Sequence, residues 1–366
     1  MGQQGNSNLR DTITNIENVT YNGLFDARIY GNDQTNIING GSGNDRINGQ
    51  GGDDYLYGRE GDDTILLGGS GNAYLDGGEG IDTFRVGLKN MDWPKSDDSN
   101  NLVNFKYTIN LEEEYAGNDT LVNFENVDYF GEYDSEITGD GKDNVISSSS
   151  GDDILRGGVG NDTLNAGSGN DFLYGEEGDD TLILGGSGTT VFDGGEGNDT
   201  VYIGLHSSRE STLIVDFENR IYKEQTEVDD PRYDTFTNVE NFEISNTDSD
   251  VIMTGDDKDN MLTTDGGNDY IRSGNGYDII STGAGNDLIH MHKNHATHSL
   301  EMTDRITDFE LGFDKIELEE IPYSDISIEQ GIGEYHNDTI VSTSDGYLVI
   351  LENLNLSIFS NNDHGS

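Results

Sequence analysis

The sequence predicts an all-β protein, a right-handed parallel β-roll (a β-helix or solenoid) in which short strands and tight turns wind into a coil. Three observations lead to this fold class: a nine-residue period, one apolar residue in each period, and turns of glycine, aspartate and asparagine. Residues 40–66 read GGSGNDRIN, GQGGDDYLY and GREGDDTIL in consecutive frames. Each frame opens on glycine, has aspartate at its sixth position and Ile47, Leu56 or Ile65 at its eighth.

The period returns in three blocks, at residues 31–85, 139–202 and 255–290. Single extra residues, Leu67 and Leu184, interrupt the first two blocks at matching places. The eighth position is apolar in all seventeen frames, although only 32% of the chain is hydrophobic. These residues are Ile38, Ile47, Leu56, Ile65, Leu75, Phe84, Ile146, Leu155, Leu164, Leu173, Leu182, Phe192, Val201, Leu262, Ile271, Ile280 and Ile289.

The composition of each frame explains the coil. Its first six residues favour tight and left-handed turns, and its last three form a strand that buries one side chain. Two frames complete one turn of the coil, so that each frame stacks on the next but one. The sixth-position carboxylates and the turn carbonyls then form files of oxygen atoms on both sides. Such hard donors suit calcium rather than zinc.

The expected metal ligands follow from this stacking. The aspartates are Asp45, Asp63 and Asp82 opposite Asp54 in the first block, Asp162, Asp180 and Asp199 opposite Asp153 and Asp171 in the second, and Asp269 and Asp287 opposite Asp278 in the third. The glycines of the same turns are Gly40, Gly43, Gly49, Gly58, Gly61, Gly157, Gly160, Gly175, Gly178, Gly194 and Gly197.

Five frames lack the sixth-position aspartate. Asn36, Asn144 and Asn260 replace it in the first frame of each block, which suits a capping turn with one neighbour only. Ala73 and Thr190 replace it just after the inserted leucines. We expect the files of metal ions to be interrupted at those turns.

The frame resembles the nonapeptide of RTX (repeats-in-toxin) proteins, a calcium-binding repeat. The resemblance covers a little under half of the chain. It implies calcium as the cofactor, on the order of ten ions, and export by a type I secretion apparatus to an extracellular or cell-surface location. It also implies a bacterial toxin or adhesin that meets a host-cell surface and takes part in virulence, with an uncleaved export signal near the C-terminus.

Composition restricts the partners. Asp and Glu number 72 against 19 Lys and Arg, a formal net charge of −53, which argues against binding nucleic acid or an anionic membrane without cations. The absence of cysteine excludes disulfides. No apolar run approaches eighteen residues and no basic-then-apolar leader opens the chain, so we expect neither a transmembrane segment nor a cleaved signal peptide.

The segments between the blocks also repeat. DTITNIENV at residues 11–19 returns as DTLVNFENV at 119–127 and DTFTNVENF at 234–242, so we expect three copies of a flank followed by a roll, in a piece of a longer protein. Residues 1–30 are then N-terminal flanking strands. Residues 86–138 and 203–254 are linkers whose strands cover roll ends, with alternating apolar residues at 103–111 and 213–221.

Residues 291–366 form the C-terminal part. Its segments at residues 304–318 and 339–354 resemble the region that follows the roll in many RTX proteins, which implies a β-rich cap and a secretion signal.

Other candidate sites favour plainer interpretations. His290, His292, His295 and His298 are spaced irregularly for one metal site, so we expect a solvated linker. Trp93 is expected to anchor a loop rather than stack on a sugar.

Motifs for catalysis are missing. The sequence contains no HExxH, GxSxG or GxxxxGK[ST] motif, and paired acids such as Asp53 and Asp54 lie in the repeating turn. We therefore expect no enzyme in these residues. The sequence favours a calcium-dependent folding and secretion module that is disordered at low calcium. A calcium-stiffened adhesin that binds a glycan or receptor, and the non-catalytic tail of a secreted enzyme, stay open as alternatives.

Overall fold

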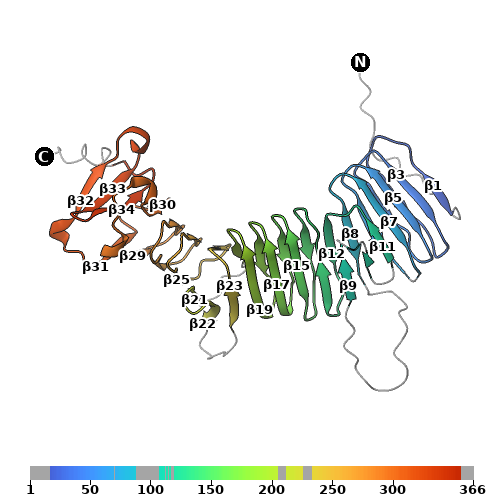
Figure 1. The fold of residues 1–366 in the computed structure, drawn as a ribbon, viewed down its shortest axis with the longest axis horizontal. Helices are drawn as coiled ribbons and strands as arrows, with labels where there is room; N and C mark the ends of the chain where they lie inside the picture. The colour runs from blue at the N-terminus through green and yellow to red at the C-terminus, as the bar shows by residue number, and fades with distance from the viewer. Residues whose placement is uncertain are drawn as a thin grey trace, which may run out of the picture. The chain divides into compact units, whose positions relative to one another are not determined.

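The computed structural model describes residues 17–69, 71–87, 107–111, 113, 115–116, 119–204, 212–225 and 233–355. The chain divides into two compact units, residues 1–140 with 144–149, and residues 141–143 with 150–366. Each unit is a coil of two sheets, with mostly parallel strands stacked side by side (Figure 1). The predicted parallel β-roll is confirmed.

In the first unit, the first sheet runs in the order β1 (Asn18–Thr20), β3 (Ile37–Gly41), β5 (Tyr55–Glu60), β7 (Tyr74–Glu79), β11 (Asp119–Val122), β10 (Tyr115–Ala116), β9 (Tyr107–Asn110) and β13 (Ser135–Thr138). The second sheet contains β2 (Arg28–Tyr30), β4 (Arg46–Asn48), β6 (Thr64–Leu67), β8 (Thr83–Val86), β12 (Asn126–Tyr129) and β14 (Val145–Ser147).

In the second unit, the first sheet runs in the order β15 (Ile154–Val159), β17 (Gly169–Glu177), β19 (Gly188–Glu196), β23 (Asp234–Thr237), β22 (Ile221–Gln225), β21 (Thr212–Asp216), β25 (Val251–Thr254), β27 (Tyr270–Arg272), β29 (Leu288–His292) and β31 (Lys315–Glu319). The second sheet contains β16 (Thr163–Asn165), β18 (Thr181–Leu184), β20 (Thr200–Gly204), β24 (Asn241–Ser245), β26 (Met261–Thr263), β28 (Ile279–Ser281), β30 (Arg305–Ile306), β34 (Gly346–Leu351), β33 (Thr339–Thr343) and β32 (Ser327–Gln330).

The register places each frame on the next but one. Ile38 pairs with Leu56 and Leu56 with Leu75 in the first sheet, while Ile47 pairs with Ile65 in the second. Every one of the seventeen eighth-position residues is buried, with at most 1% of its surface exposed. The core is therefore a column of single apolar side chains between the two sheets.

The segments between blocks continue this column. Val127 of the DTLVNFENV phrase pairs with both Phe84 and Ile146, and Phe242 of the DTFTNVENF phrase pairs with both Val201 and Leu262. The flank phrases are thus degenerate coils of the roll.

The linkers add strands to one sheet only. Between β19 and β25 the first sheet holds three strands, β23, β22 and β21, where the second sheet holds only β24 between β20 and β26. In the first unit β11, β10 and β9 have the same topology opposite β12. Two extra strands lengthen one side of each coil by about 10 Å. Of the predicted linker strands, Leu213 and Val215 are buried, whereas Val103 and Phe105 lie outside the described residues.

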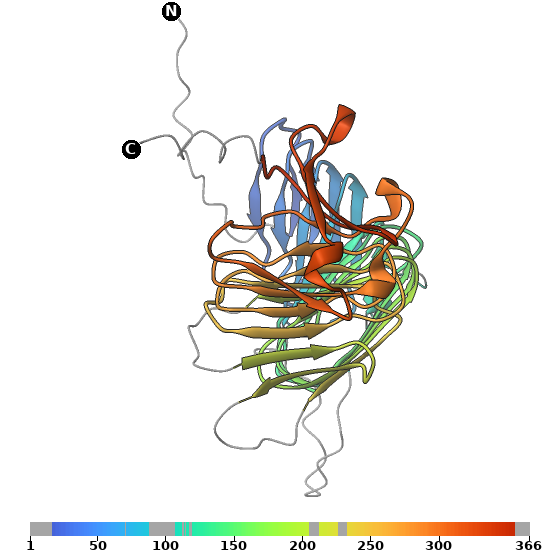
Figure 2. The same cartoon turned by 90° about the vertical axis from the view of Figure 1, so that its left-hand side faces the viewer.

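The C-terminal segment extends and then closes the second unit. Ile306 and Ile316 pair with Ile280 and Ile289, so two more coils follow the third block. The antiparallel strands β32 to β34 complete this end of the unit (Figure 2). Short 3-10 helices at Lys293–His295, Leu300–Met302, Tyr323–Asp325 and Gly333–Tyr335 connect these strands.

Candidate metal sites

The sixth-position aspartates lie inside the turns. All twelve predicted aspartate ligands are buried, with at most 3% of the surface exposed. An ionised carboxylate in such a place needs a compensating partner, because burial removes its hydration.

These aspartates form the predicted files. The backbone N–H of Asp45 donates to Asp63 Oδ1 at 2.7 Å, and that of Asp63 donates to Asp82 Oδ1 at 2.7 Å. The same bond joins Asp162 to Asp180 at 2.7 Å, Asp180 to Asp199 at 2.8 Å, Asp153 to Asp171 at 2.9 Å and Asp269 to Asp287 at 2.9 Å. On the opposite sides, Asp54 Oδ1 accepts from the N–H of Asn36 and Asp278 Oδ1 from that of Asn260. Each coil therefore presents its carboxylate to the coil before it.

The second carboxylate oxygen has no protein partner in most of these residues. Oδ2 is buried and accepts no hydrogen bond in Asp45, Asp63, Asp82, Asp180, Asp199, Asp269, Asp278 and Asp287. Burial raises the pKa of Asp63, Asp269 and Asp278 to about 7, although a backbone or side-chain hydrogen bond opposes the shift in each case. The pKa of Asp54, Asp82, Asp180 and Asp199 rises to about 6 for the same reason. A cation beside Oδ2 would oppose this shift, because a nearby positive charge favours the ionised carboxylate.

The first-position glycines leave room beside these oxygens. A Cβ on Gly58 would lie 2.1 Å from Asp63 Oδ2 and 2.3 Å from the carbonyl oxygen of Gly77. A Cβ on Gly175 would lie 2.2 Å from Asp180 Oδ2 and 2.3 Å from the Gly194 carbonyl oxygen. A carboxylate oxygen and a carbonyl oxygen of the next coil therefore converge on a space that any side chain would fill. Gly40, Gly49, Gly157 and Gly194 lie against the Oδ2 atoms of their own frames in the same way.

The fourth-position glycines allow the backbone conformation of the turn. Gly61, Gly160, Gly178 and Gly197 have φ between +115° and +150°, a region that favours glycine. Gly43 is not among the residues with positive φ, and a Cβ there would lie 2.5 Å from the backbone of Phe25.

The donor set fits calcium. Calcium takes six to eight oxygen ligands in flexible sites, including carboxylates and backbone carbonyls. The described residues contain no group of three or more His, Asp or Glu side chains that could hold a metal ion. Any ion in these turns would therefore need carbonyl oxygens in addition to the aspartates.

The three asparagine frames have a different arrangement. Asn260 Oδ1 accepts from the N–H of Asp256 at 3.1 Å, and its Nδ2 donates to the Glu240 carbonyl oxygen at 2.9 Å. Asn144 Nδ2 donates to the Glu125 carbonyl oxygen at 2.7 Å. The expectation that these turns have one neighbour only is wrong, because the degenerate flank coils stack on their other side. β3, which follows Asn36, likewise pairs with both β1 and β5.

Ala73 and Thr190 stand at the sixth position of their frames and have no carboxylate. Both are buried, and the N–H of Thr190 donates to Asp234 Oδ1 at 2.6 Å. Asp234 belongs to the DTFTNVENF phrase, and burial raises its pKa to about 6. A carboxylate outside the repeats thus takes the place of a repeat aspartate.

The cap supplies two further aspartates that the repeat search missed. Asp304 Oδ1 accepts from the N–H of Asp278 at 3.0 Å, and Asp314 Oδ1 accepts from that of Asp287 at 3.2 Å. Asp304 Oδ2 is buried without a hydrogen bond, and burial raises the pKa of this residue to about 8. The signal was present, because Asp304-Arg305-Ile306 and Asp314-Lys315-Ile316 repeat the sixth to eighth positions of a frame.

A second ladder runs along the fifth positions, which sequence reasoning left unassigned. Asn161 donates its N–H to Asp143 Oδ1 at 2.8 Å, and Asp179 donates its N–H to Asn161 Oδ1 at 3.0 Å. These side chains accept from the following coil, whereas the sixth-position carboxylates accept from the preceding one. They are exposed and their Oδ1 atoms accept hydrogen bonds between turns, so we assign them to the coil rather than to a metal.

The histidine segment differs from the solvated linker that the sequence suggested. His290 is only 5% exposed, and its Nε2 lies 3.0 Å from Glu319 Oε2. The His295 side chain is 6% exposed and its Nδ1 lies 3.6 Å from Asp304 Oδ2, and burial lowers the pKa of His295 to about 4. The prediction of a solvated linker is therefore wrong for His290 and His295, because β29 and the cap enclose them. Trp93 lies outside the described residues.

Together, the coil and its buried turn carboxylates define a parallel β-roll whose turns carry oxygen donors. Comparison with family models identifies the repeat: the chain contains the RTX calcium-binding nonapeptide repeat, matched at residues 30–65, 66–87, 131–164, 156–187, 184–202 and 254–289. This confirms the resemblance in all three blocks. RTX repeats are typical of secreted, calcium-binding proteins.

Solved structures give a weaker comparison. The chain is similar to the extracellular lipase LipA from Serratia marcescens, with 12% sequence identity and a TM-score of 0.21, over 61% of this chain. The match spans 38% of the length of that lipase. No curated protein matches the chain. Among the described residues, no helix is long and apolar enough to cross a membrane.

Proposed function

We propose that this chain is the calcium-dependent folding and secretion module of a type I-secreted bacterial exoprotein, a toxin. The observation that carries the proposal is the file of buried Oδ2 atoms without hydrogen bonds, exemplified by Asp63, Asp180 and Asp278. A calcium ion bound beside each of these atoms would supply the missing partner. The twelve repeat aspartates, with the glycines of the same turns, are the proposed ligands.

The charge of the chain explains the dependence on calcium. A net charge of −53 opposes compaction, and glycine-rich repeats lose much conformational entropy on folding. At the low free calcium inside a bacterium the chain stays unfolded and can pass a narrow export channel. Outside the cell, calcium binds and the folded roll cannot return.

The binding energy is large enough for this role. At a calcium concentration ten times the dissociation constant, each independent site stabilises the fold by about 1.4 kcal/mol. About ten such sites would contribute roughly 14 kcal/mol, near the upper end of the stability of an ordinary domain, about 5–15 kcal/mol.

The test is a calcium titration of the purified chain. Far-ultraviolet circular dichroism should report a disordered chain in chelator and a β-rich chain in millimolar calcium, with a cooperative transition. Magnesium at the same concentration is the control for charge screening, because it rarely accepts many protein ligands. A β-rich, compact chain in chelator would overturn the proposal.

One surface favours adhesion as a second candidate function. Tyr55 on β5 is 46% exposed, its ring centroid lies 6.3 Å from that of Tyr74, and Tyr57 lies 5.8 Å from Tyr74. The Arg59 guanidinium lies 4.7 Å from the Tyr57 ring centroid. Clustered aromatic rings of this kind can stack on sugars or on a receptor. Calcium-dependent binding to a glycan array, lost in Tyr55→Ala and kept in Tyr277→Ala, would favour an adhesin.

We assign no catalysis to this chain, since its acidic pairs lie in the structural turns. Were it the tail of a secreted enzyme, the catalytic motif would lie elsewhere in that protein. Sequencing the gene on both sides of the region that encodes residues 1–366 distinguishes a toxin, an adhesin and an enzyme.

A further inference from the structure

Two degenerate coils join the repeat blocks, and we name them the joint coils: residues 119–129, with β11 and β12, and residues 234–245, with β23 and β24. Neither contains a nonapeptide frame. The buried Val127 follows Leu121 by only six positions, whereas Ile65 follows Leu56 by nine. A shorter turn has no room for the glycine-rich loop that carries the repeat aspartate.

A glutamate makes the bond that a repeat aspartate makes elsewhere. Glu125 Oε2 accepts from the N–H of Asp82 at 2.8 Å, and Glu240 Oε2 accepts from that of Asp199 at 3.1 Å. Within the repeats, Asp82 Oδ1 and Asp199 Oδ1 accept the same bond from the coil before them. The longer side chain reaches the file from a shorter turn.

An asparagine carbonyl replaces the glycine carbonyl of a repeat coil. A Cβ on Gly77 would lie 2.1 Å from the Asn123 carbonyl oxygen and 2.6 Å from Asp82 Oδ2. The second joint is similar, since a Cβ on Gly194 would lie 2.0 Å from the Asn238 carbonyl oxygen and 2.4 Å from Asp199 Oδ2. Two oxygens thus converge beside each glycine, as they do between repeat coils.

The asparagines are held in the same way in both joints. Asn123 and Asn238 have φ of +54° and +50°. Their Nδ2 atoms donate to Asp76 Oδ1 and Asp193 Oδ1, each at 2.8 Å. The matching geometry in two separate units indicates a built feature.

One carboxylate oxygen of each last repeat aspartate has no hydrogen-bond partner. Asp82 and Asp199 are 0% exposed, and their Oδ2 atoms accept no hydrogen bond. Burial and the neighbouring glutamate charge both raise the pKa of these aspartates. An unpaired buried carboxylate is costly, and a cation beside these oxygens would offset that cost.

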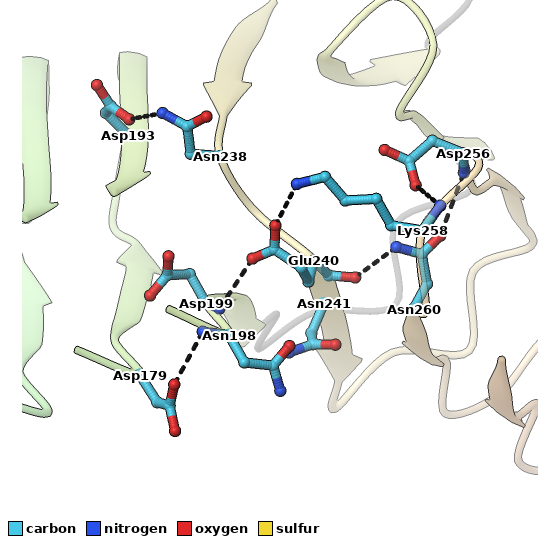
Figure 3. Close-up of polar contacts among 10 residues, drawn as sticks. All are labelled: Asp179, Asp193, Asn198, Asp199, Asn238, Glu240, Asn241, Asp256, Lys258 and Asn260. Atoms are coloured by element: carbon cyan, nitrogen blue, oxygen red, sulfur yellow. Dashed lines mark hydrogen bonds and ion pairs between the residues drawn. The ribbon is translucent and has the colours of Figure 1, made fainter. Parts of the chain in front are cut away.

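On the side that faces the third block, the second joint coil is contacted by a lysine side chain. Lys258 Nζ lies 2.5 Å from Glu240 Oε1, and Asn260 Nδ2 donates to the Glu240 carbonyl oxygen (Figure 3). Nitrogen donors therefore satisfy Glu240 on the side of the third block. The file of oxygens from the second block ends between Asp199 and Glu240.

We propose that each joint coil completes one additional calcium site, between Asp82 and Glu125 and between Asp199 and Glu240, with the Asn123 and Asn238 carbonyl oxygens as further ligands. The inference rests on the proposed function and extends the calcium files beyond the nonapeptide repeats. These sites tie each block to the joint that follows it.

The experiment counts calcium ions bound by the full chain, by equilibrium dialysis and by native mass spectrometry at saturating calcium. Glu125→Gln and Glu240→Gln keep a side-chain oxygen for the N–H of Asp82 or Asp199 but lose the charge. We expect each variant to bind one ion fewer than the parent, and the double variant two fewer. Circular dichroism in calcium checks that each variant is folded.

Two matched variants separate the inference from the proposed function. Glu243→Gln makes the same change on β24, where Glu243 is half-buried between the inward Phe242 and Ile244, and should leave the ion count unchanged. Asp180→Asn, inside a repeat file, should lower the count. If Asp180→Asn lowers it and neither glutamine variant does, the joint sites are overturned and the proposed function stands. If Asp180→Asn also leaves it unchanged, the proposed function fails too.

Discussion

Two kinds of contact between stacked coils can be compared, and we call each contact a step. One joins two repeat coils, and the other joins a joint coil to the first coil of the next block. The apolar column runs through both, but the polar side chains in the turns differ. Between Asp162 and Asp180 the bridging side chain is a carboxylate, and Asp180 Oδ2 has no hydrogen bond. Between Glu240 and Asn260 it is an amide, whose nitrogen donates to a carbonyl oxygen. Replacing one oxygen by an NH2 group thus supplies a hydrogen-bond donor where the repeat step leaves a carboxylate oxygen without one.

This contrast indicates where calcium acts. Phe242 pairs with Val201 on one side and Leu262 on the other, so the apolar column continues through the joint. If calcium is required as proposed, the turns rather than the apolar column determine where it binds. We expect the asparagine steps to be least sensitive to its removal.

The largest effect is expected from deleting residues 304–366. The deletion removes Ile306 and Ile316 from the column and the Asp304 carboxylate from the file, which leaves β28 and β29 as open edges. The calcium-induced dichroism change of the third block should be lost. Deletion of residues 356–366 alone is the control, and a titration unchanged by the longer deletion would refute the capping role.

Truncating the column compares the two kinds of coil directly. Leu182→Ala in a repeat should lower the free energy of unfolding by about 2–5 kcal/mol and Phe242→Ala in a joint by about 3–5 kcal/mol, because both side chains are at most 1% exposed. Urea denaturation in saturating calcium measures both. Ile183→Ala, at a half-buried position of the same strand as Leu182, should cost less. A negligible cost at Phe242 would show that the joint is not part of the column.

Asn260→Asp converts a joint step into a repeat-like one. The variant loses the Nδ2 donor and places a carboxylate oxygen against the Glu240 carbonyl oxygen, so at low calcium it should be destabilised by about 1–3 kcal/mol. Calcium should recover part of this loss. Denaturation tests it at high calcium and at low calcium, defined as the lowest concentration that folds the parent chain. Asn294→Asp, at an exposed residue, is the control for added charge. Equal stability of Asn260→Asp and parent at low calcium would contradict the contrast.

A change in pH is expected to have the smallest effect. The folded pKa of Asp63, Asp180 and Asp278, about 6 to 7, lies above the ordinary value of 3.8, so without calcium the folded state binds more protons than the unfolded state. Without calcium, the free energy of folding should therefore become less unfavourable as pH falls from about 7 to 4. In calcium the opposite holds, because protons compete for the same oxygens.

The midpoint of the calcium titration should thus move to higher calcium at pH 5 than at pH 7.5. Affinity should fall by about tenfold per pH unit below the pKa for each proton that an ion displaces. Midpoints that do not change with pH would argue that these carboxylates are not ligands.

Much of the fold was accessible from sequence because its repeat is local. The nine-residue period fixed the strands, the buried column and the stacking of frames, and it placed partners such as Asp45 and Asp63 in one file. Each of these features depends on neighbours at constant separation along the chain, which a periodic pattern records directly.

The joints and the cap were not accessible in this way. Asp199 meets Glu240 and Asp278 meets Asp304 at separations that no period predicts. The same holds for the burial of His290 and His295, which depends on packing against the cap.

The sequence by itself determined the coil, its core and the repeat aspartates, because a period of nine residues dictates which side chains share a face. Only the tertiary structure decided where the files continue and where they end. Glu125, Glu240, Asp304 and Asn260 acquire their roles from non-local contacts, since whether a buried carboxylate needs a cation depends on the groups that the fold places beside it.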